Sequence, residues 1–217
     1  MQTRRMTNNA TDPATMYALI EDQQRDIAAR QAAIVPPMTL TWGLAWLTGF
    51  LALWLVDGLS PAFALPVPIA IGLFVAANAA GVAISAILGV RSNRGYRPSR
   101  KDTFTGIVYG NTWPVGIVAI LLMGWGLSIQ GMSGEIAGHF YPASVVVFAG
   151  IMYITAGAVW QATPCVVVGA VIVAAGVAST FIPAPGHLLF LAIAAGGAFL
   201  VLAAVSLRWT RKNAVLA

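Results

Sequence analysis

Long apolar runs without a charged residue constrain this chain more than any other feature of its sequence. On each side of the segment 91–101 the chain has an apolar run of more than twenty residues without a charge. A helix needs about 20 apolar residues to cross the roughly 30 Å hydrocarbon core of a membrane. Hydrophobic residues make up 59% of the chain and charged residues 9%, whereas a soluble domain has about 25% charged residues. The sequence therefore predicts an all-α, polytopic membrane protein.

Six apolar segments are separated by turns that contain polar residues, glycine or proline. We predict transmembrane helices at 38–56, 66–90, 105–127, 142–160, 163–182 and 187–207. Together they form a membrane domain over 38–207, between a cytoplasmic segment 1–37 and a basic cytoplasmic tail 208–217. Trp42 and Trp46 lie one turn apart near the cytoplasmic end of the first segment, where aromatic residues gather at a membrane interface.

The distribution of Lys and Arg predicts the orientation of these six segments. With both termini inside, all twelve fall on the cytoplasmic side: four before the first segment, five in 91–101 and three in the tail. Cytoplasmic loops of membrane proteins carry such an excess of Lys and Arg. We therefore expect a protein of the bacterial cytoplasmic membrane with both termini in the cytoplasm. The formal charge of +5 follows from the same bias, so we expect no nucleic-acid partner.

Residues 13–34 have the pattern of an amphipathic helix that lies on the cytoplasmic side. Tyr17, Ile20 and Ile27 fall on one stripe, at spacings of three and seven residues. The stripe is too thin to hold a helix in water alone. We therefore expect this helix to lie on the membrane surface or against a partner.

The basic loop between the second and third segments has two interpretations. One is attraction to anionic lipid, worth about 1 kcal/mol for each basic residue near the surface. The other is a docking surface for a cytoplasmic protein. The residues predicted to dock a partner, in this loop and in the amino-terminal helix, are Arg91, Arg94, Tyr96, Arg97, Arg100, Lys101, Tyr17, Ile20 and Ile27.

Few polar residues interrupt the six segments, and none of them is Asp, Glu, Lys or Arg. Their absence argues against a proton-driven pump, an ion exchanger and an intramembrane hydrolase, so we expect no enzyme. Ser85, Asn111 and Thr155 lie at similar depths, about 8–9 Å from the cytoplasmic ends of their segments. With Asn78 they form a candidate polar layer that would line a substrate path. The alternative is hydrogen bonding between helices, worth about 0.6 kcal/mol for each pair.

Small residues recur every fourth position in the second segment, at Ala77, Gly81, Ser85 and Gly89. Such a ridge lets two helix backbones approach closely in a membrane. We therefore predict that this ridge packs against a neighbouring helix.

The two histidines, His139 and His187, both fall on the outer side of the predicted membrane domain. Glu135 precedes His139 by four residues, a helical spacing at which both side chains could bind a metal ion together with His187. The alternative, which we favour, is a set of interfacial polar residues in separate outer segments. We therefore expect neither a metal nor a cofactor.

The order of these elements resembles the membrane subunits of ABC exporters of the polysaccharide and drug-resistance type. In that family a helix before the first span lies on the membrane, and the loop between spans two and three contacts the ATPase. The matching stretches here are residues 13–34 and 91–103. The resemblance implies a membrane subunit associated with transport that works with a cytoplasmic ATPase through these two stretches.

The segments that contain Trp42-Gly-Leu-Ala-Trp46 and residues 152–161 also resemble small six-span actinobacterial membrane proteins without an assigned activity. A second function therefore stays open beside transport. It is a membrane-embedded interaction, scaffold or regulatory protein without a transport path of its own. The partners expected are membrane lipids, a cytoplasmic ATPase or another protein subunit, and a second copy of the chain.

Overall fold

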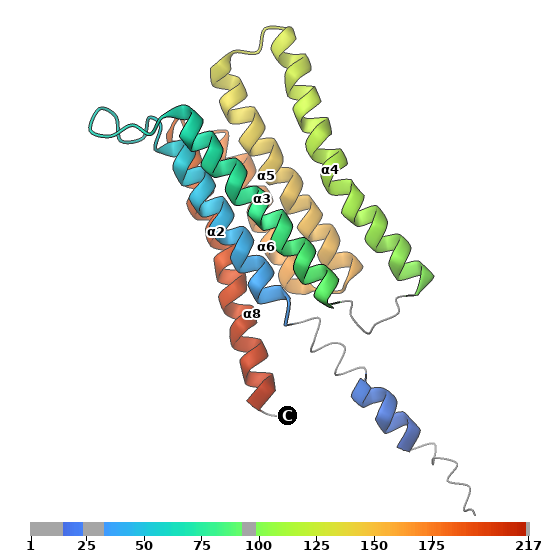
Figure 1. Ribbon diagram of the computed structural model, residues 1–217. Coiled ribbons are helices and arrows are strands. Elements are labelled where there is room, and N and C mark those ends of the chain that lie inside the picture. Colours follow the sequence, from blue (N-terminus) through green and yellow to red (C-terminus); the bar gives the residue numbers. More distant parts are fainter. Residues whose placement is uncertain (1–14, 24–32, 93–98, 216–217) are drawn as a thin grey trace, which may run out of the picture.

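The computed structural model describes residues 15–23, 33–92 and 99–215 (Figure 1). Apart from one isolated bridge between Leu59 and Phe63, these residues form helices and turns. The prediction of an all-α chain is therefore confirmed for the part that the structure describes.

A short helix over residues 15–23 precedes the bundle. The helices that follow are α2 (Val35–Trp54), α3 (Val67–Ser92), α4 (Arg100–Ile129), α5 (Gly134–Val159), α6 (Thr163–Ser179), α7 (Gly186–Leu191), the π-helical η1 (Ala192–Gly196) and α8 (Gly197–Val215). By length and composition, α3, α4, α5 and the continuous segment from α7 into α8 can each cross a membrane. These four helices support a membrane protein. α6 is apolar but, with 17 residues, is shorter than these four helices. α2 is not one of the four helices that are long and apolar enough to cross a membrane.

Two helical hairpins flank a central helix. α2 pairs with α3, α5 pairs with α6, and the segment from α7 through η1 to α8 packs against both α2 and α6 (Figure 1). α4 packs against α5, and α3 packs against α2. α3 and α4 are therefore the two edge helices of the bundle, although they follow one another in the sequence.

The core lies where α2, α5, α6 and the central helix meet. Its most completely buried large side chains are Phe50, Val146, Ile172, Leu191 and Phe199. In the most apolar stretches of α5 and of the central helix, 33% and 39% of the residues are buried, against 6% for α3 and 11% for α4. The edge helices therefore present most of their apolar surface outward, as lipid-facing helices do.

Local capping explains where α4 and α5 begin. Ser99 and Asp102 form a capping box, in which the Ser99 hydroxyl accepts from the Asp102 backbone N–H at 3.1 Å. The Ser133 hydroxyl accepts from the Ile136 backbone N–H at 3.3 Å. α5 therefore begins at Gly134, so the eight residues before the predicted segment 142–160 are helical.

Candidate functional site

The predicted docking residues lie partly within the structure. Arg91 is exposed in the last turn of α3, and Arg100 and Lys101 are exposed in the first turn of α4. Three further residues of the loop, Arg94, Tyr96 and Arg97, lie outside the described residues. The described basic residues therefore flank the loop at the ends of the two edge helices.

The amino-terminal docking stripe is described in part. Tyr17 and Ile20 lie on the helix over 15–23, where both side chains are exposed, and Ile27 lies outside the described residues. The helices of the bundle therefore do not cover the two described residues of this stripe.

The small-residue ridge on α3 faces α2 over three of its four positions. The Trp42 indole Nε1 donates to the Ser85 hydroxyl at 3.0 Å. A Cβ atom at Gly81 would lie 3.3 Å from the Trp42 ring, and Ala77 packs against the core. A Cβ atom at Gly89 would meet nothing within 4 Å, so the close approach between α2 and α3 ends before that turn.

Three of the four residues of the predicted polar layer form hydrogen bonds within their own helices, and these bonds do not join them to one another. Asn78 donates to the Phe74 carbonyl at 2.9 Å, Asn111 to the Ile107 carbonyl at 2.8 Å, and Thr155 to the Ile151 carbonyl at 2.9 Å. Each of these acceptors lies one turn back in the same helix, which is where a polar side chain in apolar surroundings finds a partner. Ser85 bonds instead across the seam between α2 and α3.

Aromatic rings link the edge helix α4 to the opposite edge helix α3 through the core. Their centroids are 4.8 to 6.5 Å apart and their planes are mostly edge to face. In spatial order the rings are Trp160, Tyr109, Trp113, Tyr153, Phe199, Trp46, Phe50 and Phe74. Trp46 is buried in the core, because α2 packs between α3 and the central helix.

The two histidines meet at the end of the bundle that carries the α4–α5 turn and the α6–α7 turn. Their rings stack with centroids 4.0 Å apart and an interplanar angle of 23°. His139, in the second turn of α5, has Nδ1 3.1 Å from the Glu135 carbonyl oxygen and Nε2 3.0 Å from the Ile182 carbonyl oxygen. His187, in the first turn of α7, has Nε2 3.2 Å from the Gly138 carbonyl oxygen. Side chains 48 positions apart in the sequence therefore tie α5 to the turn before α7 and to α7 itself.

The geometry of this pair differs from a metal centre. Glu135 meets His139 through its backbone carbonyl, and its side chain is exposed. Among the described residues, no group of three or more His, Cys, Asp or Glu residues is placed to hold a metal ion. The spacing of Glu135 and His139 indicated a shared helix face, whereas the stacking with His187 depends on a tertiary contact that no sequence spacing reveals.

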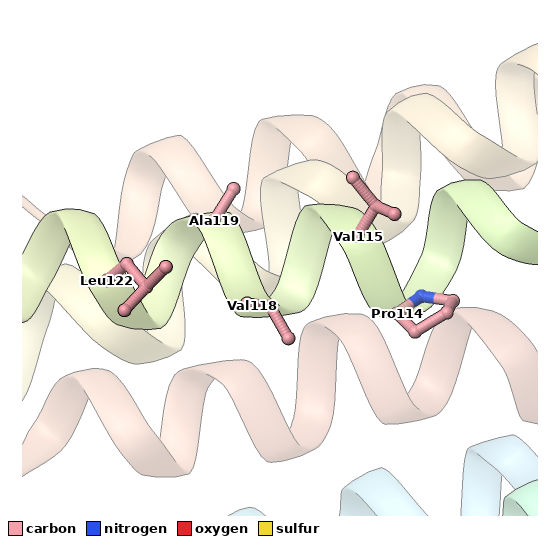
Figure 2. Close-up of a pocket in the computed structure, with 5 residues that line it drawn as sticks. All are labelled: Pro114, Val115, Val118, Ala119 and Leu122. Carbon is pink, nitrogen blue, oxygen red and sulfur yellow. The ribbon is translucent and has the colours of Figure 1, made fainter.

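A shallow groove of about 430 Å³ runs along the outer surface of α4 (Figure 2). It is lined by Pro114, Val115, Val118, Ala119 and Leu122, all from this one helix. The lining offers no side-chain hydrogen-bonding group. The groove is therefore apolar surface of the kind that lipid chains cover.

In comparisons with family models, with curated proteins and with solved structures, nothing matches this chain.

Proposed function

We propose that the protein is an integral membrane subunit that acts by holding other proteins, without a path for a substrate of its own. The observation that supports this function is the use of the polar side chains in the helices. Asn78, Asn111 and Thr155 each bond a carbonyl of their own helix. A substrate path needs polar groups that converge on a shared cavity, whereas the core here is filled by aliphatic and aromatic side chains.

The arrangement of the edge helices also favours an interaction protein. Among the described residues, α3 packs chiefly against α2 and α4 chiefly against α5, and most of the apolar surface of both helices lies outward. In a membrane such surfaces are available to lipid and to the helices of another subunit. Association between membrane helices depends on close packing and on interhelical hydrogen bonds, so an uncovered helix face is where a further helix can add.

The proposal includes six membrane spans, with α2 and α6 crossing beside the four longer helices. Both pack against the central helix. α2 has 20 residues, which at about 1.5 Å per residue suffices to cross the hydrocarbon core. α6 has 17 residues and is at the lower limit of length. Both termini and all basic residues then lie in the cytoplasm of a bacterial cell.

Cysteine labelling tests the crossing of α6. In a Cys165→Ala background, Ala184→Cys is expected to react with a membrane-impermeant maleimide added outside intact cells. Thr163→Cys, at the opposite end of α6, is expected to react only after the cells are opened. Both native side chains are exposed. Labelling of both positions from the same side would contradict a membrane-crossing α6.

The interaction function is tested by extracting the protein together with its surrounding membrane into polymer-bounded discs. Native mass spectrometry is expected to find a protein subunit, or a second copy of the chain, at a fixed ratio. Photo-crosslinkers at Val82 on α3 and Val118 on α4, both exposed, are expected to react with that subunit. A protein that carries lipid alone, and that moves a solute across a reconstituted vesicle, would overturn the proposal.

A second candidate function is transport in partnership with a cytoplasmic ATPase. The observation that favours it is the capped start of α4, which holds Arg100 and Lys101 exposed at a fixed point beside the basic loop. Two cations at a helix amino terminus oppose the helix dipole, so an acidic surface that contacts them would relieve that cost. An ATPase that copurifies at a fixed ratio, and is lost with Arg100→Gln and Lys101→Gln, would support this function over the first.

A further inference from the structure

The loop between α2 and α3, residues 55–66, has an apolar tip without a charged side chain. The six residues of the tip, 59–64, are all exposed, and the only charged residue of the loop, Asp57, lies at its root beside α2. Leu59 and Phe63 keep 45% and 49% of their surface accessible, and an isolated antiparallel bridge places them opposite one another. They therefore form one apolar patch, and such patches mark contacts with another protein or with a membrane.

The loop holds its shape by hydrogen bonds within itself. The Phe63 N–H donates to the Leu59 carbonyl at 3.1 Å, and at the base the Leu65 N–H donates to the Leu55 carbonyl at 2.8 Å. Two positions of the loop have no backbone N–H, Pro61 and Pro66. A backbone donor without a partner is costly among lipid chains, so this internal pairing suits a loop that water does not surround.

The root of the loop lies at the end of a helix that can cross a membrane. α3 begins at Val67, directly after the loop, and its first turns expose Val67, Ile69 and Ile71. At the other root Trp54, in the last turn of α2, lies against Gly58, where an added Cβ would collide with the indole ring. Tryptophan is enriched at the boundary between membrane and water. Both roots therefore lie where that boundary is expected.

The loop extends sideways and does not continue along the helix axes. In Figure 1 it projects to the left from the upper ends of α2 and α3, away from the other helices of the bundle. A loop that leaves a membrane-crossing helix at the boundary and then runs sideways stays at the level of the lipids. Interfacial helices bury their apolar side chains in the same layer, about 5–10 Å deep.

We propose that residues 59–64 insert into the lipid layer beside the bundle and anchor this end of α2 and α3 in the membrane. The side chains of Leu59 and Phe63 enter the boundary between headgroups and acyl chains. The sequence places no Lys or Arg between Arg30 and Arg91, so the loop gains no attraction from anionic headgroups. Zwitterionic and anionic lipids therefore serve equally well. The inference rests on the crossing of the membrane by α3, which is part of the proposed function.

Spin-label accessibility in lipid nanodiscs tests the position of the tip. In a Cys165→Ala background, single labels are placed at Phe63→Cys in the tip, at Val82→Cys on α3 and at Gln130→Cys after α4; these three native side chains are exposed. Oxygen concentrates among acyl chains, whereas a polar nickel chelate stays in water. The ratio of oxygen to nickel accessibility is expected to be several-fold higher at Phe63 and Val82 than at Gln130, in zwitterionic and anionic discs alike.

Three other results would overturn the anchor. Nickel accessibility at Phe63 equal to that at Gln130, with Val82 still in lipid, would place the tip in water and leave the crossing of α3 intact. Low accessibility of Phe63 to both reagents would mean that protein covers the tip. A Val82 label that meets nickel as readily as Gln130 does would overturn the crossing of α3, and the anchor with it.

Removal of the apolar side chains tests what holds the tip in lipid. With Ala62→Cys as the labelled position, Leu59→Ser and Phe63→Ser together are expected to lower the oxygen-to-nickel ratio several-fold. The matched control is Leu40→Ser with Leu44→Ser, which removes two exposed apolar side chains from the first half of α2. The control is expected to leave the ratio at Ala62 unchanged. A ratio that neither pair of substitutions changes would overturn the proposal.

Discussion

The α5–α6 seam and the α4–α5 seam join helices of similar apolar character by different means. The most apolar stretches of α4 and α5 have mean hydropathies of 1.7 and 1.8. Between α5 and α6 backbone meets backbone: a Cβ at Gly169 would lie 2.6 Å from the Gly150 carbonyl oxygen. Between α4 and α5 side chains fill the space, because Gly116 faces the Phe148 ring and Gly124 faces the Tyr141 ring.

The comparison shows that apolar character does not decide which membrane helices pack closely. Lipid chains are as apolar as the helices, so burial alone gives no preference for a neighbouring helix over lipid. Small residues that allow two backbones to touch, and a few interhelical hydrogen bonds, supply the difference. α5 and α6 therefore form a buried pair, whereas α4 stays at the edge.

The largest effect is expected from breaking the α5–α6 seam with Gly169→Leu. The added side chain would begin 2.6 Å from the Gly150 carbonyl oxygen and 2.7 Å from the Ile154 backbone nitrogen, and backbone atoms cannot move aside cheaply. Overpacking a core costs about 1–3 kcal/mol and occasionally more, and we expect the upper end here. Thermal unfolding in detergent measures it, with Ala170→Leu at the exposed neighbouring position as the control. Equal melting temperatures for the two variants would contradict a closely packed seam.

A smaller effect is expected at the seam between α2 and α3. A Cβ at Gly81 would lie 3.3 Å from the Trp42 ring, which can shift, whereas a Cβ at Gly72 would meet nothing within 4 Å. Gly81→Leu should therefore destabilise the protein by about 1–2 kcal/mol. Gly72→Leu, on the same helix, should change the melting temperature little. Equal melting temperatures for the two variants would mean that the ridge on α3 faces lipid.

The membrane character of the chain follows from its sequence because charge is excluded from long apolar runs. The second predicted segment, 66–90, nearly coincides with α3 at Val67–Ser92, since prolines precede this helix and a basic loop follows it. α5 begins at Gly134, before the predicted segment 142–160, and its first two turns contain Glu135 and His139. Those polar residues are tolerated once Ser133 caps the helix.

The contacts between helices could not be predicted in the same way. In a segment that is apolar on every side, no periodicity tells which face turns inward, so the burial of Trp46 in the core could not be predicted. Depth alone also does not tell which polar side chains lie close together. Ser85 and Asn111 sit at similar depths, yet α3 packs against α2 while α4 packs against α5. The direction in which each side chain points depends on tertiary packing.

The smallest effect is expected from a hydrogen bond between α4 and α5, in which the Tyr109 hydroxyl donates to the Met152 carbonyl at 3.0 Å. Tyr109→Phe keeps the ring against Trp160 and Trp113 but removes the donor. Interhelical hydrogen bonds in membranes contribute about 0.6 kcal/mol on average, so we expect a loss of that size.

Thermal unfolding measures the stability that Tyr109→Phe removes, and backbone hydrogen exchange shows which helix loses it. Exchange should increase in α4 and stay unchanged in α6, because only the weaker seam is altered. Thr112→Val is the matched control, since the Thr112 hydroxyl donates within α4 to the Val108 carbonyl. A loss for Tyr109→Phe as large as that for Gly169→Leu would mean that α4 is as firmly packed as α6. The contrast between a glycine seam and a side-chain seam would then be wrong.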